Sequence, residues 1–257
     1  MKFLISLFLV CSVVCAHAQS KDAFKKENFV FRNDTLPLRV LYPPGFDPHK
    51  KYPLVLFLHG RGEAGKDNER QLTHRSKLFL DSISKYPAIV VFPQCPVDSY
   101  WANVKISADE SGKRHFNFQK GGKPTKAMSL LKKFFDSSMR KKFIVDNRIY
   151  VMGLSMGGMG TYELLRRRPN KVAAAVAICG GDNVKNVPKY ANKVDLWIIH
   201  GERDDVVPPT FSKNIVTKLH DLGSNIKSNF YKEANHNSWD RAFSEKELLK
   251  WLFSKRR

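Results

Sequence analysis

The chain has 257 residues, enough for one α/β domain with a buried core, and it contains no internal repeat or low-complexity linker. Its formal net charge is +20, with basic residues scattered along the sequence and several basic clusters at the ends of predicted helices. Because no aromatic residues interleave with a basic motif, this distribution argues against specific nucleic-acid binding. It favours a solvated basic surface that is attracted to anionic envelopes or polymers.

The first 18 residues have the pattern of a secretory signal peptide. Lys2 precedes a short apolar run, and Ala16-His17-Ala18 supplies a small-x-small cleavage site. Cleavage after Ala18 predicts a secreted or periplasmic protein whose mature domain spans residues 19–257. A membrane anchor and a lipoprotein are less favoured alternatives, and no later segment is long and apolar enough to span a bilayer.

Strands and helices alternate along most of the mature chain, which indicates right-handed crossovers and a mostly parallel sheet covered by helices on both faces. Segment 97–125 does not fit this alternation and predicts an insertion over one end of the sheet. The expected elements in chain order are an antiparallel strand pair at 28–32 and 36–42, strand 52–58, helix 70–84, strand 88–92, helix 126–137, strand 149–152, helix 161–168, strands 172–178 and 194–199, helix 210–222, strand 226–231 and helix 238–253.

Ser155 lies in a G-x-S-x-G motif between a short β-prone run and a predicted helix. A serine on such a sharp strand-to-helix turn is held outward, and the flanking glycines let neighbouring backbone approach closely. The pentapeptide alone is a weak signal, but strand, turn and helix in this order predict that Ser155 is a nucleophile.

A serine nucleophile needs a base and an acid, which follow it along the chain in this architecture. His236 lies in a loop just after the strand at 226–231, whereas His220 falls inside a predicted helix. We therefore expect His236 to be the base. Asp204 follows the strand at 194–199 and is the expected acid. Asp205 is the alternative, although it could instead cap the following helix.

Two backbone donors should stabilise the oxyanion. One is expected to be the N–H of Met156, and the other the N–H of Arg61 in the loop after strand 52–58, with Gly60 as the alternative. His59 in the same loop is expected to be structural, because His236 already supplies the base. Three aromatic residues are candidates for the substrate pocket: Trp101, Phe116 and Trp239.

Cofactors and metals are not indicated, because no zinc, C-x-x-C or dinucleotide motif is present. Of the four cysteines, only Cys95 and Cys179 remain in the mature chain. Export permits a disulfide between them, but two buried free thiols are the preferred interpretation.

Taken together, these motifs resemble secreted α/β-hydrolase esterases of the phospholipase/carboxylesterase and dienelactone-hydrolase-like group. The resemblance starts near Leu36, extends to the C-terminus and supports Ser155, Asp204 and His236 as the triad. Dienelactone hydrolase itself uses cysteine where this chain has Ser155, so lactone specificity is not implied. Other motifs that carry the resemblance are Leu56-Phe57-Leu58-His59-Gly60-Arg61-Gly62-Glu63, Phe92-Pro93-Gln94-Cys95-Pro96, Cys179-Gly180-Gly181 and His236-Asn237-Ser238-Trp239-Asp240.

The expected function is that of a serine carboxylesterase acting on a small-molecule or glycan ester through an acyl-enzyme. Alternatives are a serine peptidase or a lysophospholipase or thioesterase of the same fold, and a non-catalytic protein that binds the envelope through its basic surface. The sequence leaves the acyl group and the oligomeric state open.

Overall fold

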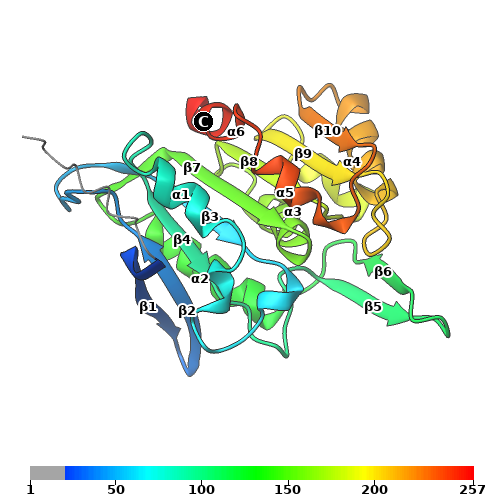
Figure 1. The fold of residues 1–257 in the computed structure, drawn as a ribbon, viewed down its shortest axis with the longest axis horizontal. Coiled ribbons are helices and arrows are strands. Elements are labelled where there is room, and N and C mark those ends of the chain that lie inside the picture. The colour runs from blue at the N-terminus through cyan, green and yellow to red at the C-terminus, as the bar shows by residue number, and fades with distance from the viewer. Residues whose placement is uncertain (1–20) are drawn as a thin grey trace, which may run out of the picture.

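The computed structural model describes residues 21–257, so the expected signal peptide lies outside the described residues. An eight-stranded sheet in the order β1-β2-β4-β3-β7-β8-β9-β10 forms its centre (Figure 1). Strand β2 pairs antiparallel with β1 and β4, and all other neighbours pair in parallel. The strands of this sheet are β1 (Phe24–Phe31), β2 (Asp34–Leu41), β3 (Tyr52–Leu58), β4 (Ile89–Pro93), β7 (Ile144–Leu154), β8 (Ala174–Ile178), β9 (Asp195–Gly201) and β10 (Lys227–Tyr231). The expected α/β-hydrolase fold with an N-terminal antiparallel pair is confirmed.

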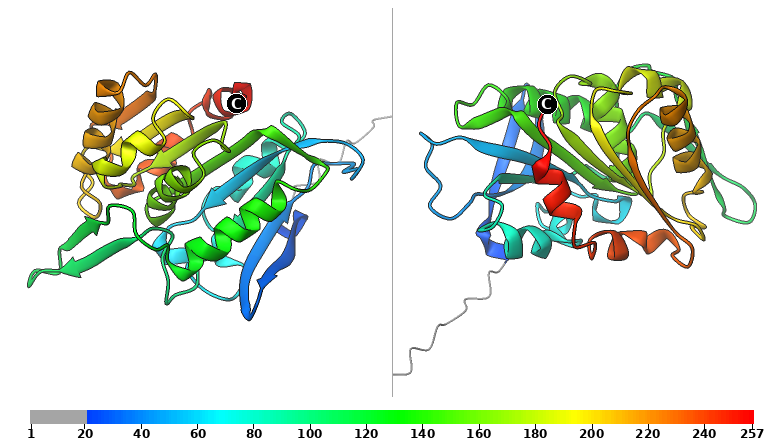
Figure 2. Two further views of the ribbon diagram at one scale, coloured as in Figure 1. Left: turned by 180° about the vertical axis from the view of Figure 1, so that it is seen from behind. Right: turned by 90° about the horizontal axis from the view of Figure 1, so that it is seen from above.

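Helices cover both faces of the sheet, as the view from above in Figure 2 shows. Helices α2, α3 and α4 pack into the apolar cluster on one face, and α1, α5 and α6 into the cluster on the other. Along β3, Leu54, Leu56 and Leu58 join the first cluster while Val55 and Phe57 join the second. This alternation explains why the strand is apolar throughout, since both of its sides are buried. The helices are α1 (Ser76–Ser82), α2 (Lys126–Ser138), α3 (Met156–Arg167), α4 (Thr210–Asp221), α5 (Trp239–Ala242) and α6 (Leu248–Ser254).

The helix expected over residues 70–84 is divided. A 3₁₀ turn at Arg70–Leu72 and helix α1 flank Arg75, which has a φ of 64°. A left-handed residue cannot continue a right-handed helix. In this conformation the Arg75 guanidinium donates a hydrogen bond to the Asp240 carboxylate. The contact joins two segments that are far apart in the sequence.

The prediction of a single last helix over residues 238–253 is wrong. Short helices α5 and α6 are separated by a turn around Ser244, whose hydroxyl donates to the carbonyl of Asp240 at 2.8 Å. Serine side chains compete with the backbone in this way and disfavour helix continuation. Tyr231 additionally bonds to Glu245 within the turn at 2.7 Å, which ties it to the end of β10.

The expected insertion is built around an antiparallel hairpin of β5 (Val104–Ala108) and β6 (Arg114–Phe118). The hairpin projects from the body of the molecule beyond the central sheet (Figure 1). Strand β6 contributes Arg114 and Phe116 to a pocket at the carboxyl ends of the parallel strands, where ligands bind in such sheets. Cys95 and Cys179 are both buried and free, in agreement with the preferred interpretation of the sequence.

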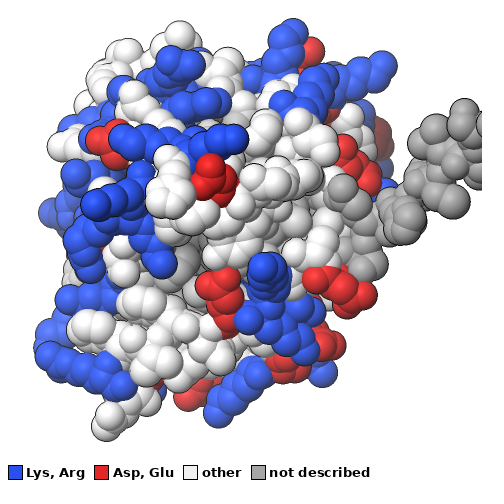
Figure 3. Space-filling view, turned by 90° about the vertical axis from the view of Figure 1, so that its left-hand side faces the viewer, with Lys and Arg blue, Asp and Glu red and all other residues white. Residues whose placement is uncertain are grey.

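On the face seen in Figure 3, Lys and Arg gather along the left and upper parts, uncharged residues cover the middle, and most acidic residues lie at the lower right. Many cations have acidic partners, as in the pairs Lys26–Glu69 and Arg168–Asp136. Within residues 21–257, none of the helices combines the length and hydropathy that a bilayer crossing requires.

Candidate active site

Ser155 occupies the turn between β7 and α3, with φ 52° and ψ −117°. A non-glycine residue with this backbone conformation is strained and is retained where the surrounding structure fixes it. Here the Ser155 N–H donates to the carbonyl of Ile178 on β8 at 2.9 Å, and its own carbonyl accepts from Met159 at 3.0 Å. The turn therefore holds the hydroxyl at the carboxyl edge of the sheet, as the motif predicts.

Both glycines of the motif are required by close backbone contacts. A Cβ on Gly153 would lie 2.2 Å from the carbonyl oxygen of Gly157, and a Cβ on Gly157 would lie 1.9 Å from that of Leu58. No side chain fits at these separations, because the contacting atoms are backbone atoms that cannot rotate away. The motif thus reflects how tightly α3 packs against β3 and β7.

The structure brings the three residues expected to form the triad into a hydrogen-bonded chain. His236 Nε2 lies 3.0 Å from Ser155 Oγ, and His236 Nδ1 lies 2.8 Å from Asp204 Oδ2. Since the carboxylate can only accept, Nδ1 carries the proton and Nε2 is left to accept from the hydroxyl. Asp205 is exposed and its side chain takes no part in this chain.

Asp204 is buried, and its carboxylate is held by several donors. Besides His236, His200 Nε2 lies 3.1 Å from Oδ2, and the N–H groups of Val206 and Val207 donate to Oδ1 at 3.0 and 2.8 Å. Burial by itself raises the pKa of this carboxyl, but hydrogen bonds from the two histidines and the turn lower it well below its usual range. Asp204 is therefore ionised throughout the neutral range.

His200 is a residue of the site that the sequence analysis did not assign. Its fully buried ring lies between Asp204 and Ser212, whose hydroxyl is 2.8 Å from Nδ1. Its Nε2 faces two acceptors, Asp204 Oδ2 and the carbonyl of Val207 at 2.9 Å, so this nitrogen carries the proton. The only signal in the sequence was its place at the end of β9, four residues before the aspartate.

Of the expected oxyanion donors, Met156 directly follows Ser155, and Arg61 lines the same pocket as Ser155. Met156 is the first residue of α3, where an N–H has no partner within the helix. Arg61 begins the 3₁₀ turn after β3, and its side chain turns away to the carbonyls of Ser99 and Val97, at 2.9 and 2.6 Å. The bulky side chain thus leaves the backbone of its loop free to line the pocket.

The pocket around Ser155 has a volume of about 260 Å³. Phe116 from the hairpin and Trp239 line it, as expected, and the Trp239 ring meets His236 edge to face at 5.2 Å. Trp101 does not line the pocket, so that expectation is wrong. Its fully buried indole packs against α3, where Gly160 leaves the space that a Cβ would fill.

One wall of the pocket is polar. Glu63 is buried, with Oε1 3.4 Å from His74 Nε2 and Oε2 without a hydrogen-bond partner among residues 21–257. The carboxylate of Glu63 raises the pKa of His74, which favours a cation there. Arg114 lines the pocket from β6 and has no acidic partner within the described chain.

His59 has a structural role, in agreement with the sequence analysis. Its Nδ1 lies 2.6 Å from the carbonyl of Gly60, and its Nε2 accepts from the N–H of Cys95 at 2.9 Å. Burial lowers the pKa of His59 to about 4, so it stays neutral. The ring therefore links the loop after β3 to the loop after β4.

Within residues 21–257, one group has the spacing of metal ligands: Cys179, Asp204 and His236. These groups are poorly suited to that role, because burial raises the pKa of the Cys179 thiol and keeps it protonated. The oxygens of Asp204 already accept four hydrogen bonds, and His236 Nδ1 donates one of them. The cluster thus serves to orient His236.

The fold and the hydrogen-bonded chain at the elbow define a serine hydrolase of the α/β-hydrolase fold. Residues 46–249 match the family model described as phospholipase/carboxylesterase. The chain belongs to this family, whose members act on carboxylic ester bonds.

Two curated proteins are similar to it in sequence. It is 28% identical over 207 residues to the bifunctional acetylxylan esterase/xylanase XynS20E of Neocallimastix patriciarum, an alignment that covers 78% of this chain and 27% of that protein. It is 25% identical over 178 residues to dipeptidyl-peptidase 5 of Porphyromonas gingivalis, covering 65% of this chain and 23% of that protein. The chain thus spans about a quarter of the length of these relatives.

Solved structures show the same fold. A thermostable esterase superimposes with a TM-score of 0.80 and 31% identity, over 92% of this chain and 64% of that chain. A ferulic acid esterase superimposes with a TM-score of 0.65 and 16% identity, over 90% of this chain and 97% of that chain. At such low identity, the second likeness concerns the fold alone.

Proposed function

We propose that this protein is an exported serine carboxylesterase that removes acyl groups from glycans through a Ser155–His236–Asp204 triad. The observation that carries the proposal is the chain of hydrogen bonds of 3.0 and 2.8 Å that joins these three side chains beside an open pocket. This arrangement matches the requirement of a serine nucleophile for a base and of the base for an orienting carboxylate.

The first half of the reaction forms an acyl-enzyme. Ser155 Oγ attacks the ester carbonyl carbon while His236 Nε2 takes the hydroxyl proton, and Asp204 stabilises the resulting imidazolium. The N–H groups of Met156 and Arg61 hold the oxyanion of the tetrahedral intermediate. His236 then gives its proton to the alcohol oxygen, which leaves as the C–O bond breaks.

The second half releases the acid. Water enters in place of the alcohol, and His236 Nε2 takes one of its protons as the water oxygen attacks the acyl carbon. The same two N–H groups stabilise the second oxyanion. The intermediate collapses with return of the proton to Ser155 Oγ, so the carboxylic acid leaves and the enzyme is restored.

A glycan ester is supported by the polar wall of the pocket and by the relatives. Glu63 and His74, which line the pocket, offer an acceptor and a donor to hydroxyl groups beside the ester. The similarity to an acetylxylan esterase points in the same direction. Export, inferred from the segment before residue 19, would bring the enzyme to extracellular glycans.

The experiment compares the wild type with Ser155→Ala on p-nitrophenyl acetate, acyl esters of graded chain length, and acetylated and feruloylated sugars. We expect hydrolysis by the wild type, loss of activity in Ser155→Ala and labelling of the wild type alone by a fluorophosphonate. Ser107→Ala, at an exposed serine of the hairpin, serves as the matched control. Hydrolysis by Ser155→Ala equal to that of the wild type would refute the assignment of the nucleophile.

Peptidase activity is a second candidate, favoured by the similarity to dipeptidyl-peptidase 5. The same triad could attack a peptide amide. Dipeptide p-nitroanilides tested beside the esters separate the two functions. Turnover of the anilides with none of the esters would replace the esterase proposal, whereas turnover of esters alone would exclude the peptidase.

A further inference from the structure

A second cavity lies beside the catalytic pocket and is lined by the same strand, β6. It is an open groove of about 290 Å³, built from β6, the loop after β8 and the start of α4. Three phenylalanines, three asparagines and two further residues line it: Phe116, Asn117, Phe118, Asp182, Asn183, Val184, Phe211 and Asn214. Nothing in the proposed chemistry at Ser155 requires this groove.

The apolar part of the groove is aromatic. Phe118 meets Phe211 edge to face at 5.0 Å and stacks with Phe116 at 6.2 Å, and the rings cover Gly181, where a Cβ would lie 2.8 Å from the Phe118 ring. Val184 adds an apolar side chain that is 37% exposed. Phe116 and Phe211 are partly exposed, whereas Phe118 is buried and supports them. Exposed aromatic faces suit the C–H faces of a sugar ring, which are apolar.

The polar part of the groove consists of three carboxamides and the buried carboxylate of Asp182. Asn214 is exposed, and its side chain has no hydrogen-bond partner among residues 21–257. Asn117 Oδ1 accepts from Gln119 at 3.2 Å, which leaves its two amide protons available. A carboxamide donates and accepts at once, as a sugar hydroxyl does, and carries no charge. Aromatic faces with neutral amides fit a glycan better than an ionic ligand or an acyl chain.

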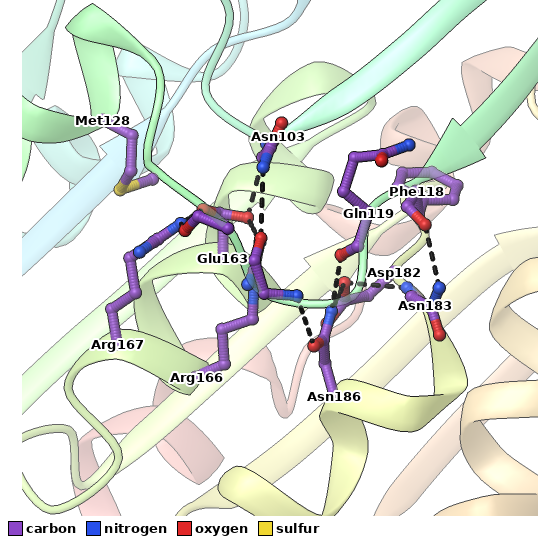
Figure 4. Close-up of polar contacts among 12 residues, drawn as sticks. Asn103, Phe118, Gln119, Met128, Glu163, Arg166, Arg167, Asp182, Asn183 and Asn186 are labelled. Carbon is purple, nitrogen blue, oxygen red and sulfur yellow. Dashed lines mark hydrogen bonds and ion pairs between the residues drawn. The ribbon is translucent and has the colours of Figure 1, made fainter.

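The groove is fixed by a buried polar cluster under the base of the hairpin (Figure 4). Asn183 Nδ2 donates to the carbonyl of Phe118 at 2.9 Å, and Asn186 Nδ2 to that of Gln119 at 3.1 Å. Asn186 Oδ1 in turn accepts from the N–H of Gly121 at 3.1 Å. These bonds join the loop after β8 to the end of β6, so the two walls of the groove cannot separate without breaking them.

A buried carboxylate anchors the other strand of the hairpin. Glu163 on α3 is held by the guanidinium groups of Arg166 and Arg167 and accepts from the N–H of Asn103, just before β5, at 3.3 Å. Arg167 also donates to the carbonyl of Gly122 at 2.9 Å. Because both ends of the hairpin are bound to the body, the groove is preorganised and little ordering accompanies ligand binding.

The groove adjoins the catalytic pocket. Phe116 lines both, and Val206 of the catalytic pocket packs in one apolar cluster with Phe116 and Phe211 of the groove. A chain of sugar units with an ester at Ser155 could therefore pass over Phe116 into the groove. We propose that the groove is a glycan subsite that binds sugar units on the alcohol side of the ester. This inference rests on the proposed esterase function.

The test measures kcat/KM for acetylated xylose, acetylated xylotetraose and p-nitrophenyl acetate. We expect the wild type to prefer the tetrasaccharide. Phe211→Ala and Asn214→Ala should each lower kcat/KM for the tetrasaccharide, mainly through KM, by about five- to tenfold while p-nitrophenyl acetate changes less than about twofold. Ile106→Ala, at an exposed hairpin residue outside the groove, is the matched control and should change neither.

A direct titration separates this inference from the function. Unesterified xylotetraose is added to two folded proteins, the Ser155→Ala variant and the Ser155→Ala/Asn214→Ala double variant. Binding to each is followed by NMR. Weaker binding of xylotetraose by the double variant than by Ser155→Ala supports the subsite. If the wild type hydrolyses no ester, only the proposed function is overturned, and this binding result still supports the subsite. Equal kcat/KM for acetylated xylose and xylotetraose, together with equal binding by both variants, would overturn the subsite.

Discussion

His200 and His236 donate to the same carboxylate oxygen, Oδ2 of Asp204, at 3.1 and 2.8 Å. The first imidazole is fully buried and the second reaches Ser155. The carboxylate thus lies between a fixed structural donor and the proposed base. We infer that His200 holds Asp204 in the rotamer that orients His236.

Replacing His200 with leucine should lower kcat on p-nitrophenyl acetate by about tenfold or more at nearly unchanged KM, because a donor to a buried charge is lost. His200→Gln, which keeps a donor near the position of Nε2, should recover much of this loss. Thermal unfolding establishes that both variants are folded. Equal kcat for folded His200→Leu and the wild type would show that His200 does not position the acid.

Asp204 and Asp205 are neighbours in sequence but should behave differently. Asp204→Asn should reduce kcat by about 10⁴-fold, since the His236 tautomer is no longer fixed and the imidazolium no longer stabilised. Asp205→Asn should stay within about twofold, because that side chain is exposed and outside the hydrogen-bonded chain. A larger loss in Asp205→Asn would transfer the role of the acid to Asp205.

Arg61 should act through its side chain although its backbone lines the pocket. Its guanidinium fixes the loop after β3 to the carbonyls of Val97 and Ser99, and Arg61→Ala removes both bonds. We expect kcat to fall by about tenfold, because the oxyanion donor loses its position. Inhibition by a boronic acid should weaken by the same factor.

Lys66→Ala, at an exposed lysine of the same loop, is the control and should keep the activity of the wild type. A rise in KM for Arg61→Ala at constant kcat would instead indicate that Arg61 contributes to substrate binding. That result would mean that the loop around Arg61 does not supply an oxyanion donor.

The elbow could be predicted because its signals are local. Gly153 is required by a backbone contact with Gly157 in the same motif, and the strand and helix on either side have their own sequence patterns. Gly157 itself contacts Leu58 on β3, but the spacing of the motif already records it. The order along the chain and the predicted helix around His220 then favoured His236 as the base, and the end of a strand favoured Asp204 as the acid with Asp205 as the alternative. Asp204 follows a strand whose apolar run is visible in the sequence, whereas the strand before His236 is short and largely polar.

The remaining features depend on tertiary contacts that no local pattern records. Trp101 was expected in the pocket, but the space beside Gly160 on α3 determines its place. His200 could not be assigned without knowing that Ser212 and Asp204 flank its ring. The break at Arg75 likewise accompanies a contact with Asp240, which is distant in sequence.

Asp182 gives the protein a pH-dependent stability. Burial raises the pKa of its carboxyl to about 6, and Oδ2 has no partner among residues 21–257. Since the folded state binds the proton more tightly than the unfolded state, the free energy of unfolding falls as pH rises from about 4 to about 6 and stays lower above that. The loss is at most about 3 kcal/mol.

Asp182→Asn should remove this dependence, because a neutral amide can still accept from Asn183 N–H and Asn186 through its oxygen. We expect the Tm of the variant to exceed that of the wild type at pH 8 by about 5 °C and the difference to shrink toward pH 5. Calorimetry across this range measures it, with the exposed Asp205→Asn as control. Parallel profiles of Tm against pH for Asp182→Asn and the wild type would contradict the prediction. They would mean that ionisation of Asp182 does not lower the free energy of unfolding, because nearby Arg166 balances its charge.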